Sequence, residues 1–199
     1  MQTGDLVFTQ LGSDENMISA VTQGYRGARP DHMGVIIKNS IGLFVIEAFP
    51  PEVRITHIDV FLRRSTFQNK IDTEARYMIG KLKSEYEDLI PRAIEYGLKQ
   101  RDIPYDRLYL PDATKLYCSE LVVDMFKYAN TGNEFFIETP MSFRDLDTGL
   151  IHQHWVNHYR YFGLDVPDGE PGSSPGEISL DNRLEIYKIH GPIFGLDKA

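Results

Sequence analysis

A single cysteine stands at the expected start of a helix. Cys118 is the only cysteine among the 199 residues, and it lies in the segment Tyr-Cys-Ser-Glu at 117–120. The apolar residues after it have helical spacing: Leu121, Val122, Met125, Phe126 and Ala129. The free amide groups and the dipole of a helix N-terminus favour a thiolate, which is the form of cysteine that attacks a carbonyl carbon. The position therefore points to a nucleophile for acyl transfer.

The same cysteine also has a structural interpretation. Free cysteine is among the residues most often buried in protein interiors, with no catalytic role. The apolar stripe that begins at Leu121 faces the core, and Cys118 lies one turn earlier on the same side. We therefore expect the thiol to point inward, where it can border both the core and a cleft.

A histidine and a glutamate in the N-terminal third can complete the chemistry. His32 opens one apolar run and Glu47 closes the next, and the turn between these β-branched runs predicts a hairpin. A two-residue loop at 39–40 puts the two residues directly opposite each other, whereas a four-residue loop makes them diagonal neighbours. Both loops place the side chains on one face, within reach of an imidazole–carboxylate hydrogen bond.

Composition favours one globular domain over residues 1–199. Hydrophobic residues make up 42 % of the chain and aromatic residues 12 %, enough for a sizeable core. No stretch approaches the roughly 18 continuous apolar residues of a membrane-spanning helix. The formal charge of −8 argues against a nucleic-acid partner. The pair Arg63-Arg64 is interpreted as part of a solvated face.

The N-terminus leaves the cellular compartment open. The chain begins Met-Gln-Thr-Gly and enters an apparent strand at once, with no basic segment followed by an apolar one. The protein is cytoplasmic as the chain stands, or it belongs to the periplasm or cell envelope after removal of a signal segment. The sequence does not indicate an oligomeric state.

The remaining pattern predicts a mixed fold. From residue 72 to Gln100 the spacing predicts helix, first with Ala75, Met78, Ile79 and Leu82 on one side and then with a second segment that begins near Pro91. Residues 183–189 alternate and predict a last strand.

Five segments resemble, in chain order, the motifs of the YiiX-like permuted papain-fold family within the NlpC/P60 superfamily. They are Gly4–Phe8, Asp31–Val35, Val45–Ala48, Pro104–Asp106 and Tyr117–Val122. The Tyr-Cys-Ser-Glu-Leu and His-x-Gly blocks are the specific parts. The resemblance implies an α+β, circularly permuted papain-like fold, with a small antiparallel sheet or barrel packed against helices and the histidine strand before the cysteine helix.

The resemblance also implies a cysteine amidase, peptidase or acyl hydrolase that works through an acyl-enzyme. Cys118 would be the nucleophile, His32 the general base and Glu47 the orienting residue, while Asp31 stands where serine is common. The expected substrate is a small-molecule, peptide or lipid-linked acyl compound, such as a cell-wall peptide or an amino-acid conjugate. Tyr117, Tyr105 and Asp31 are expected to border its site, although both tyrosines also suit aromatic packing.

Other candidates carry less chemistry. The helical spacing of His152, His154 and His158 suits a metal, but no glutamate completes a His-Glu-x-x-His pattern, so we predict neither a metal site nor a cofactor. An aromatic cluster could line an acyl pocket or belong to the core: Trp155, Tyr159, Tyr161 and Phe162. The alternative function is a catalytically silent module that binds a peptide or lipid in the same cleft. The pH at which iodoacetamide modifies the thiol separates the two functions.

Overall fold

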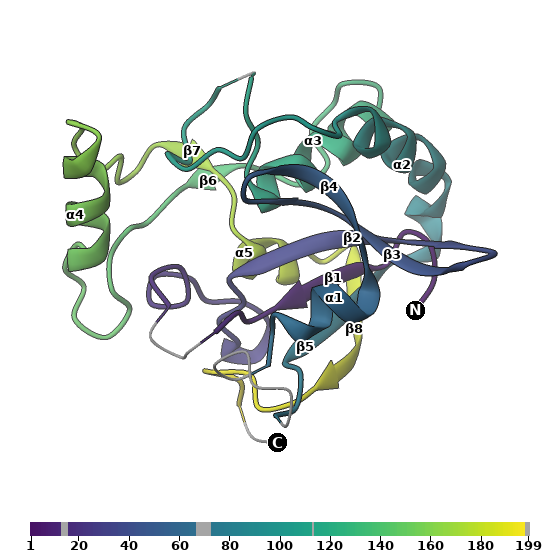
Figure 1. Cartoon of the computed structure of the whole chain (residues 1–199), viewed down its shortest axis with the longest axis horizontal. Coiled ribbons are helices and arrows are strands. Elements are labelled where there is room, and N and C mark those ends of the chain that lie inside the picture. Colours follow the sequence, from purple (N-terminus) through teal and green to yellow (C-terminus); the bar gives the residue numbers. More distant parts are fainter. Residues whose placement is uncertain (13–15, 67–72, 113, 198–199) are drawn as a thin grey trace.

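An antiparallel sheet of six strands forms the centre of the molecule, in the order β4-β3-β2-β1-β5-β8 (Figure 1). The computed structural model describes residues 1–12, 16–66, 73–112 and 114–197. The strands are β1 (Leu6–Thr9), β2 (His32–Asn39), β3 (Gly42–Phe49), β4 (Glu52–His57), β5 (Tyr77–Leu82) and β8 (Leu184–His190). A second, two-stranded sheet pairs β6 (Thr139–Pro140) with β7 (Pro171–Gly172).

Helices cover both faces of the central sheet. The helices α2 (Ile90–Lys99) and α3 (Cys118–Ala129) pack on the face that carries Met33 and Val35. The short helix α1 (Ile58–Arg63) packs on the other face, against Ile36 and Val45. The helix α4 (Gln153–Tyr161) lies apart from the sheet in Figure 1, and α5 (Pro175–Ser179) follows β7. The described residues also contain the 3₁₀ helices η1 (Tyr25–Gly27) and η3 (Ser84–Leu89).

The start of α3 is fixed by its own sequence. The carboxylate of Glu120 accepts a hydrogen bond from the N–H of Tyr117, which satisfies one of the free donors of the first turn. The apolar stripe beginning at Leu121 is fully buried against the sheet, as its spacing predicts. Cys118 is therefore held at the mouth of a well-packed helix, beside the beginning of β2.

The hairpin of β2 and β3 has the diagonal register. Lys38 pairs with Leu43 and Asn39 with Gly42, so that the strands turn through the two residues Ser40 and Ile41 and not through the four-residue loop expected for this register. The paired register extends from there to Val35 and Ile46. Side chains alternate along each strand, and His32 and Glu47 consequently share the face covered by α1.

The predicted helix before Pro91 is wrong. Its first position, residue 72, lies outside the described residues, and Tyr77–Leu82 form strand β5 in the interior of the sheet. Tyr77 and Ile79 are buried on one face while Met78 and Leu82 are buried on the other. A strand with two buried faces lacks polar alternation, and its apolar run imitates helical spacing. The second segment is helical, as α2, and residues 184–190 form the predicted last strand, β8.

Candidate active site

The imidazole of His32 is bound to a buried carboxylate. Its Nε2 atom lies 2.6 Å from Oε2 of Glu47, in the diagonal pairing that the hairpin register allows. His32 is 3 % exposed and Glu47 is fully buried. The ring packs between Phe49 and Phe61, with both ring centroids 5.3 Å away. Because Nε2 is occupied, Nδ1 is the nitrogen left for another partner.

Glu47 is held by two further groups. Its Oε1 atom accepts hydrogen bonds from the hydroxyl of Thr56 and from Nη2 of Arg64, each at 2.5 Å. Burial alone would raise the pKa of Glu47, but the hydrogen bond and charge of His32, with Arg64 and Thr56, lower it to about 2. The carboxylate is therefore ionised at any physiological pH.

The interpretation of Arg64 as a solvated surface residue is wrong. Its side chain is 21 % exposed, and the guanidinium lies 4.0 Å from the centroid of the Phe49 ring while it binds Glu47. Helix α1 ends at Arg63 and turns the next residue back over the sheet. The sequence shows the Arg63-Arg64 pair, but the pair alone does not indicate which residue either arginine binds.

Cys118 is buried, and its chemistry differs from the expectation of a low thiol pKa. The residue is 3 % exposed at the first position of α3. Burial raises the pKa of Cys118 to about 12 and outweighs the hydrogen bonds from the backbone of Met33 and Ser119. The charge of Asp31 acts in the same direction as burial. Burial therefore favours the protonated thiol over the thiolate.

The thiol and the imidazole approach the same end of β2 from different sides. Helix α3 packs on the face of Met33, whereas the His32 ring contacts Phe61 on the face of α1. The backbone of Met33, the residue next to His32, is nevertheless one of the groups that lower the pKa of Cys118, so the thiol is close to that part of β2. Within the described part of the chain no hydrogen bond joins thiol and imidazole, so a direct contact between them stays a prediction.

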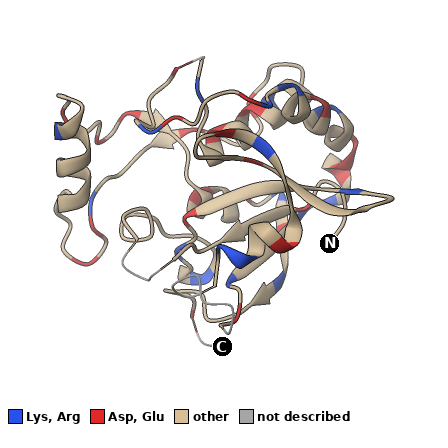
Figure 2. Ribbon diagram, viewed as in Figure 1, with Lys and Arg blue, Asp and Glu red and all other residues tan. Residues whose placement is uncertain are grey.

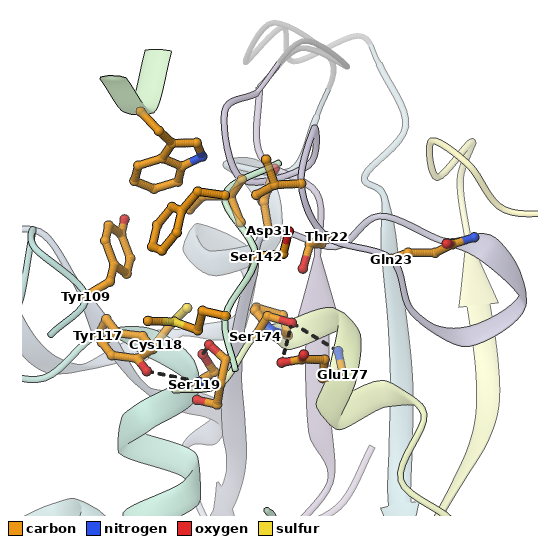
Figure 3. A pocket seen from close by; sticks show the side chains of 17 residues that line it. Thr22, Gln23, Asp31, Tyr109, Tyr117, Cys118, Ser119, Ser142, Ser174 and Glu177 are labelled. Atoms are coloured by element: carbon orange, nitrogen blue, oxygen red, sulfur yellow. Dashed lines mark hydrogen bonds between the residues drawn. The ribbon is translucent and has the colours of Figure 1, made fainter. Parts of the chain in front are cut away.

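A pocket of about 140 Å³ opens at Cys118 (Figure 3). Its lining comes from the loop after β1, the start of α3, the segments around β6 and β7, and α4. The apolar wall consists of Ile18, Val21, Tyr109, Met141, Phe143 and Trp155. Two carboxylates, of Asp31 and Glu177, belong to the lining, and the charged side chains of this wall are all acidic. The pocket is thus small and largely apolar, with two carboxyl groups in its wall.

The predicted substrate-binding residues are placed at different depths. Asp31 and Tyr117 line the pocket with Cys118, and the hydroxyl of Tyr117 accepts a hydrogen bond from the N–H of Ser173. Tyr105 is not among the lining residues. It lies one layer further away, with its hydroxyl 3.3 Å from that of Tyr109.

The aromatic and histidine residues in and around α4 also differ in whether they line the pocket. Trp155 lines the pocket and Tyr159 is buried behind it, whereas Tyr161 and Phe162 are exposed and belong to neither. His152 caps α4, and the ring of His158 bonds to the carbonyl of Arg107. Across the described residues, no three His, Cys, Asp or Glu side chains gather closely enough to hold a metal ion.

Outside the pocket, the molecule is characterised by its distribution of charge and by the character of its helices. Lys and Arg residues are distributed over several elements and interspersed with Asp and Glu (Figure 2). Among the helices of the described residues, none combines the length and the apolar character that a bilayer crossing requires.

In this α+β fold the strand that begins at His32 precedes the helix that begins at Cys118, which is the element order that the resemblance to a permuted papain-like fold implied. The model of the permuted papain-like amidase enzyme family, YaeF/YiiX, C92, matches residues 1–185. The chain therefore belongs to this family, and the resemblance inferred from its motifs is confirmed. No curated protein matches the chain.

A solved structure shows the same fold. The crystal structure of the metalloprotein yiiX from Escherichia coli O157:H7 superposes with a TM-score of 0.73, over 96 % of this chain and 98 % of that one. The two sequences are 20 % identical, so the likeness is one of fold. The described residues of the present chain do not bring together three side chains that could bind a metal ion.

Proposed function

We propose that the protein hydrolyses an amide or a related acyl bond through an acyl-enzyme on Cys118, with His32 as base and Glu47 as the orienting carboxylate. The observation that supports this assignment most strongly is the ionised Glu47 bound at 2.6 Å to Nε2 of His32. This bond fixes the ring and leaves Nδ1 for the thiol, which sits at the backbone of the next residue, Met33.

The high pKa of Cys118 decides how the reaction begins. A thiol with a pKa of about 12 is protonated at neutral pH, so attack on the carbonyl carbon must be coupled to loss of its proton. As the sulfur–carbon bond forms, the proton passes to Nδ1 of His32, and the negative charge of Glu47 stabilises the resulting imidazolium. The imidazolium then donates this proton to the leaving amine, and water hydrolyses the thioester.

The pocket limits the group next to the reacting carbonyl. A cavity of about 140 Å³ is close to the ~150 Å³ that holds one benzene ring. We infer that this part of the substrate is a short acyl group or an amino-acid side chain, in contact with Trp155 and Tyr117. A cell-wall peptide or a small amino-acid conjugate meets this limit, and a lipid chain would have to extend beyond the pocket.

The test uses intact mass and turnover together. The wild-type protein is incubated with acyl amides and peptidoglycan fragments, and an acyl adduct is expected on Cys118. Cys118→Ala and Cys118→Ser are expected to lose adduct and turnover, and His32→Gln to lose turnover. Glu134→Gln, at an exposed position, is the matched control with unchanged activity.

Two outcomes would contradict this function. A Cys118→Ala variant that retains more than about a tenth of the wild-type activity excludes the nucleophile, because deletion of a triad nucleophile costs many powers of ten. Equal ligand binding by wild type and Cys118→Ala, with no adduct and no turnover in either, would instead indicate the silent binding module.

A further inference from the structure

Ser173 is anchored to the residues on both sides of the nucleophile. Its backbone N–H donates to the hydroxyl of Tyr117 at 3.1 Å, and its carbonyl oxygen accepts from the hydroxyl of Ser119 at 2.9 Å. Both bonds are buried. They fix the backbone of Ser173 against the first turn of α3, at the two residues that flank Cys118.

The hydroxyl of Ser173 has no partner of its own. The residue is 5 % exposed, and its Oγ atom is buried without a hydrogen bond. Buried side-chain polar atoms without a partner occur at five described residues, Thr9, Gln10, Arg54, Arg64 and Ser173. Ser173 is the member of this set that lines the pocket of Cys118. A buried hydroxyl left unpaired is unfavourable, and its retention at this place indicates a partner that arrives with the substrate.

The neighbouring hydroxyls are already used. The Ser174 hydroxyl caps α5: it accepts from the N–H of Glu177 and donates to the carboxylate of Glu177 at 3.1 Å (Figure 3). The hydroxyl of Ser119 donates to the Ser173 carbonyl. The free hydrogen-bonding capacity among these serines is thus concentrated in Ser173.

Attack by a thiol creates a demand for such a donor. When the sulfur–carbon bond forms, the electron pair of the C=O bond moves to oxygen, and the negative oxygen needs hydrogen-bond donors. The N–H of Cys118, at the first position of α3, has no acceptor within the helix and supplies one. An N–H alone leaves a second position of this oxyanion site open.

We propose that the Ser173 hydroxyl is the second oxyanion donor, a role that rests on the proposed function of Cys118 as nucleophile. Oγ–H donates a hydrogen bond to the oxyanion and transfers no proton. The electron pair returns to form the thioester carbonyl when the protonated amine leaves, and the hydroxyl is then free for the second half-reaction.

The test measures hydrolysis of an acyl p-nitroanilide by Ser173→Ala and by Ser173→Thr. The acyl group, between acetyl and benzoyl in size, is the one that the wild-type protein hydrolyses fastest. Ser173→Ala is expected to lower kcat by about 10²–10³-fold with little change in KM. Ser173→Thr keeps a hydroxyl and should recover at least a tenth of the activity. The matching acyl aldehyde adds to Cys118 and places an oxygen in the same site, so its inhibition constant should weaken in Ser173→Ala in parallel with kcat/KM.

Ser179→Ala is the control for a purely structural serine. Its hydroxyl bonds to the N–H of Tyr25 and the carbonyl of Gly176 outside the pocket, so the variant should melt earlier and keep its kcat. Ser173→Ala removes an unpaired group and should not melt earlier.

Either of two results would overturn the role of Ser173. In the first, Ser173→Ala keeps kcat within threefold. In the second, it weakens substrate binding to a Cys118→Ala background as much as it lowers kcat/KM. Both results leave the nucleophile assignment intact, whereas activity in Cys118→Ala itself removes the proposed function.

Discussion

Replacing Asp31 by asparagine should make the protein more stable at alkaline pH and leave it little changed at acid pH. Asp31 is 2 % exposed, and its Oδ2 atom lies 3.0 Å from the hydroxyl of Ser19. The same hydroxyl lies 3.0 Å from the carbonyl oxygen of Arg29. One hydroxyl hydrogen cannot serve both acceptors. A protonated Asp31 solves the conflict, because it donates to Ser19 while Ser19 donates to the carbonyl.

The magnitude follows from the pKa of this carboxyl. Burial raises the pKa of Asp31 from 3.8 to about 7, against the hydrogen bond from the N–H of Leu11 that lowers it. The native state therefore holds the proton more tightly than the unfolded state. The resulting stability is complete below pH 3.8 and is lost as the pH rises through 7. A pKa difference of this size corresponds to about 4 kcal/mol.

Asparagine imitates the protonated carboxyl and does not titrate. The free energy of unfolding of Asp31→Asn minus that of the wild type should therefore rise by about 4 kcal/mol between pH 4 and pH 8. Urea unfolding followed by the fluorescence of Trp155, the single tryptophan, measures both proteins at five pH values. Asp165→Asn, at an exposed position, is the control. If Asp31→Asn and the wild type change in parallel with pH, Asp31 is ionised in the native protein and the reasoning is refuted.

Three further predictions concern the reacting groups. The charge of Asp31 raises the pKa of Cys118, so iodoacetamide should modify Cys118 in Asp31→Asn up to about tenfold faster at pH 9, as measured by intact mass. Glu47→Gln should lower kcat by about 10- to 10⁴-fold. It should also remove the loss of about 3 kcal/mol in wild-type stability as the pH falls from 4.5 towards 2, as measured by urea unfolding. Arg64→Ala should reduce kcat less than Glu47→Gln does, and Arg64→Lys should recover part of this loss. Equal losses of kcat in the two Arg64 variants would show that a positive charge at this position does not support Glu47.

The sequence predicts the part of the site that depends on strand parity. Side chains alternate along a strand, so any hairpin loop of even length puts His32 and Glu47 on one face, and the observed register is one of the two considered. The start of α3 at Cys118 also follows from local pattern, because its apolar stripe and Glu120 act within one or two turns. The permuted papain-like fold is predicted by the resemblance of the five motifs and not by the local patterns.

Other features depend on contacts that no local pattern contains. Arg64 reaches Glu47 because α1 packs beside β3 and β4. Ser173 reaches the start of α3 from 54 residues beyond Ser119. The pKa of the Cys118 thiol depends on its burial, which raises the pKa and which the local helix pattern does not contain. The sequence of strand β5 imitates a helix because apolar residues are buried on both of its faces.

The two halves of the site differ in how far they reach along the chain. Glu47 finds its three partners 9 to 17 residues away, whereas the first turn of α3 is tied to Ser173 across 54 and 56 residues. Contacts between near neighbours lose less chain entropy on closure and form sooner. As the chain leaves the ribosome, the oriented base can assemble long before the nucleophile has its surroundings. The surroundings of Cys118 in a nascent chain are therefore complete only when the C-terminal quarter, which contains Ser173, has been made.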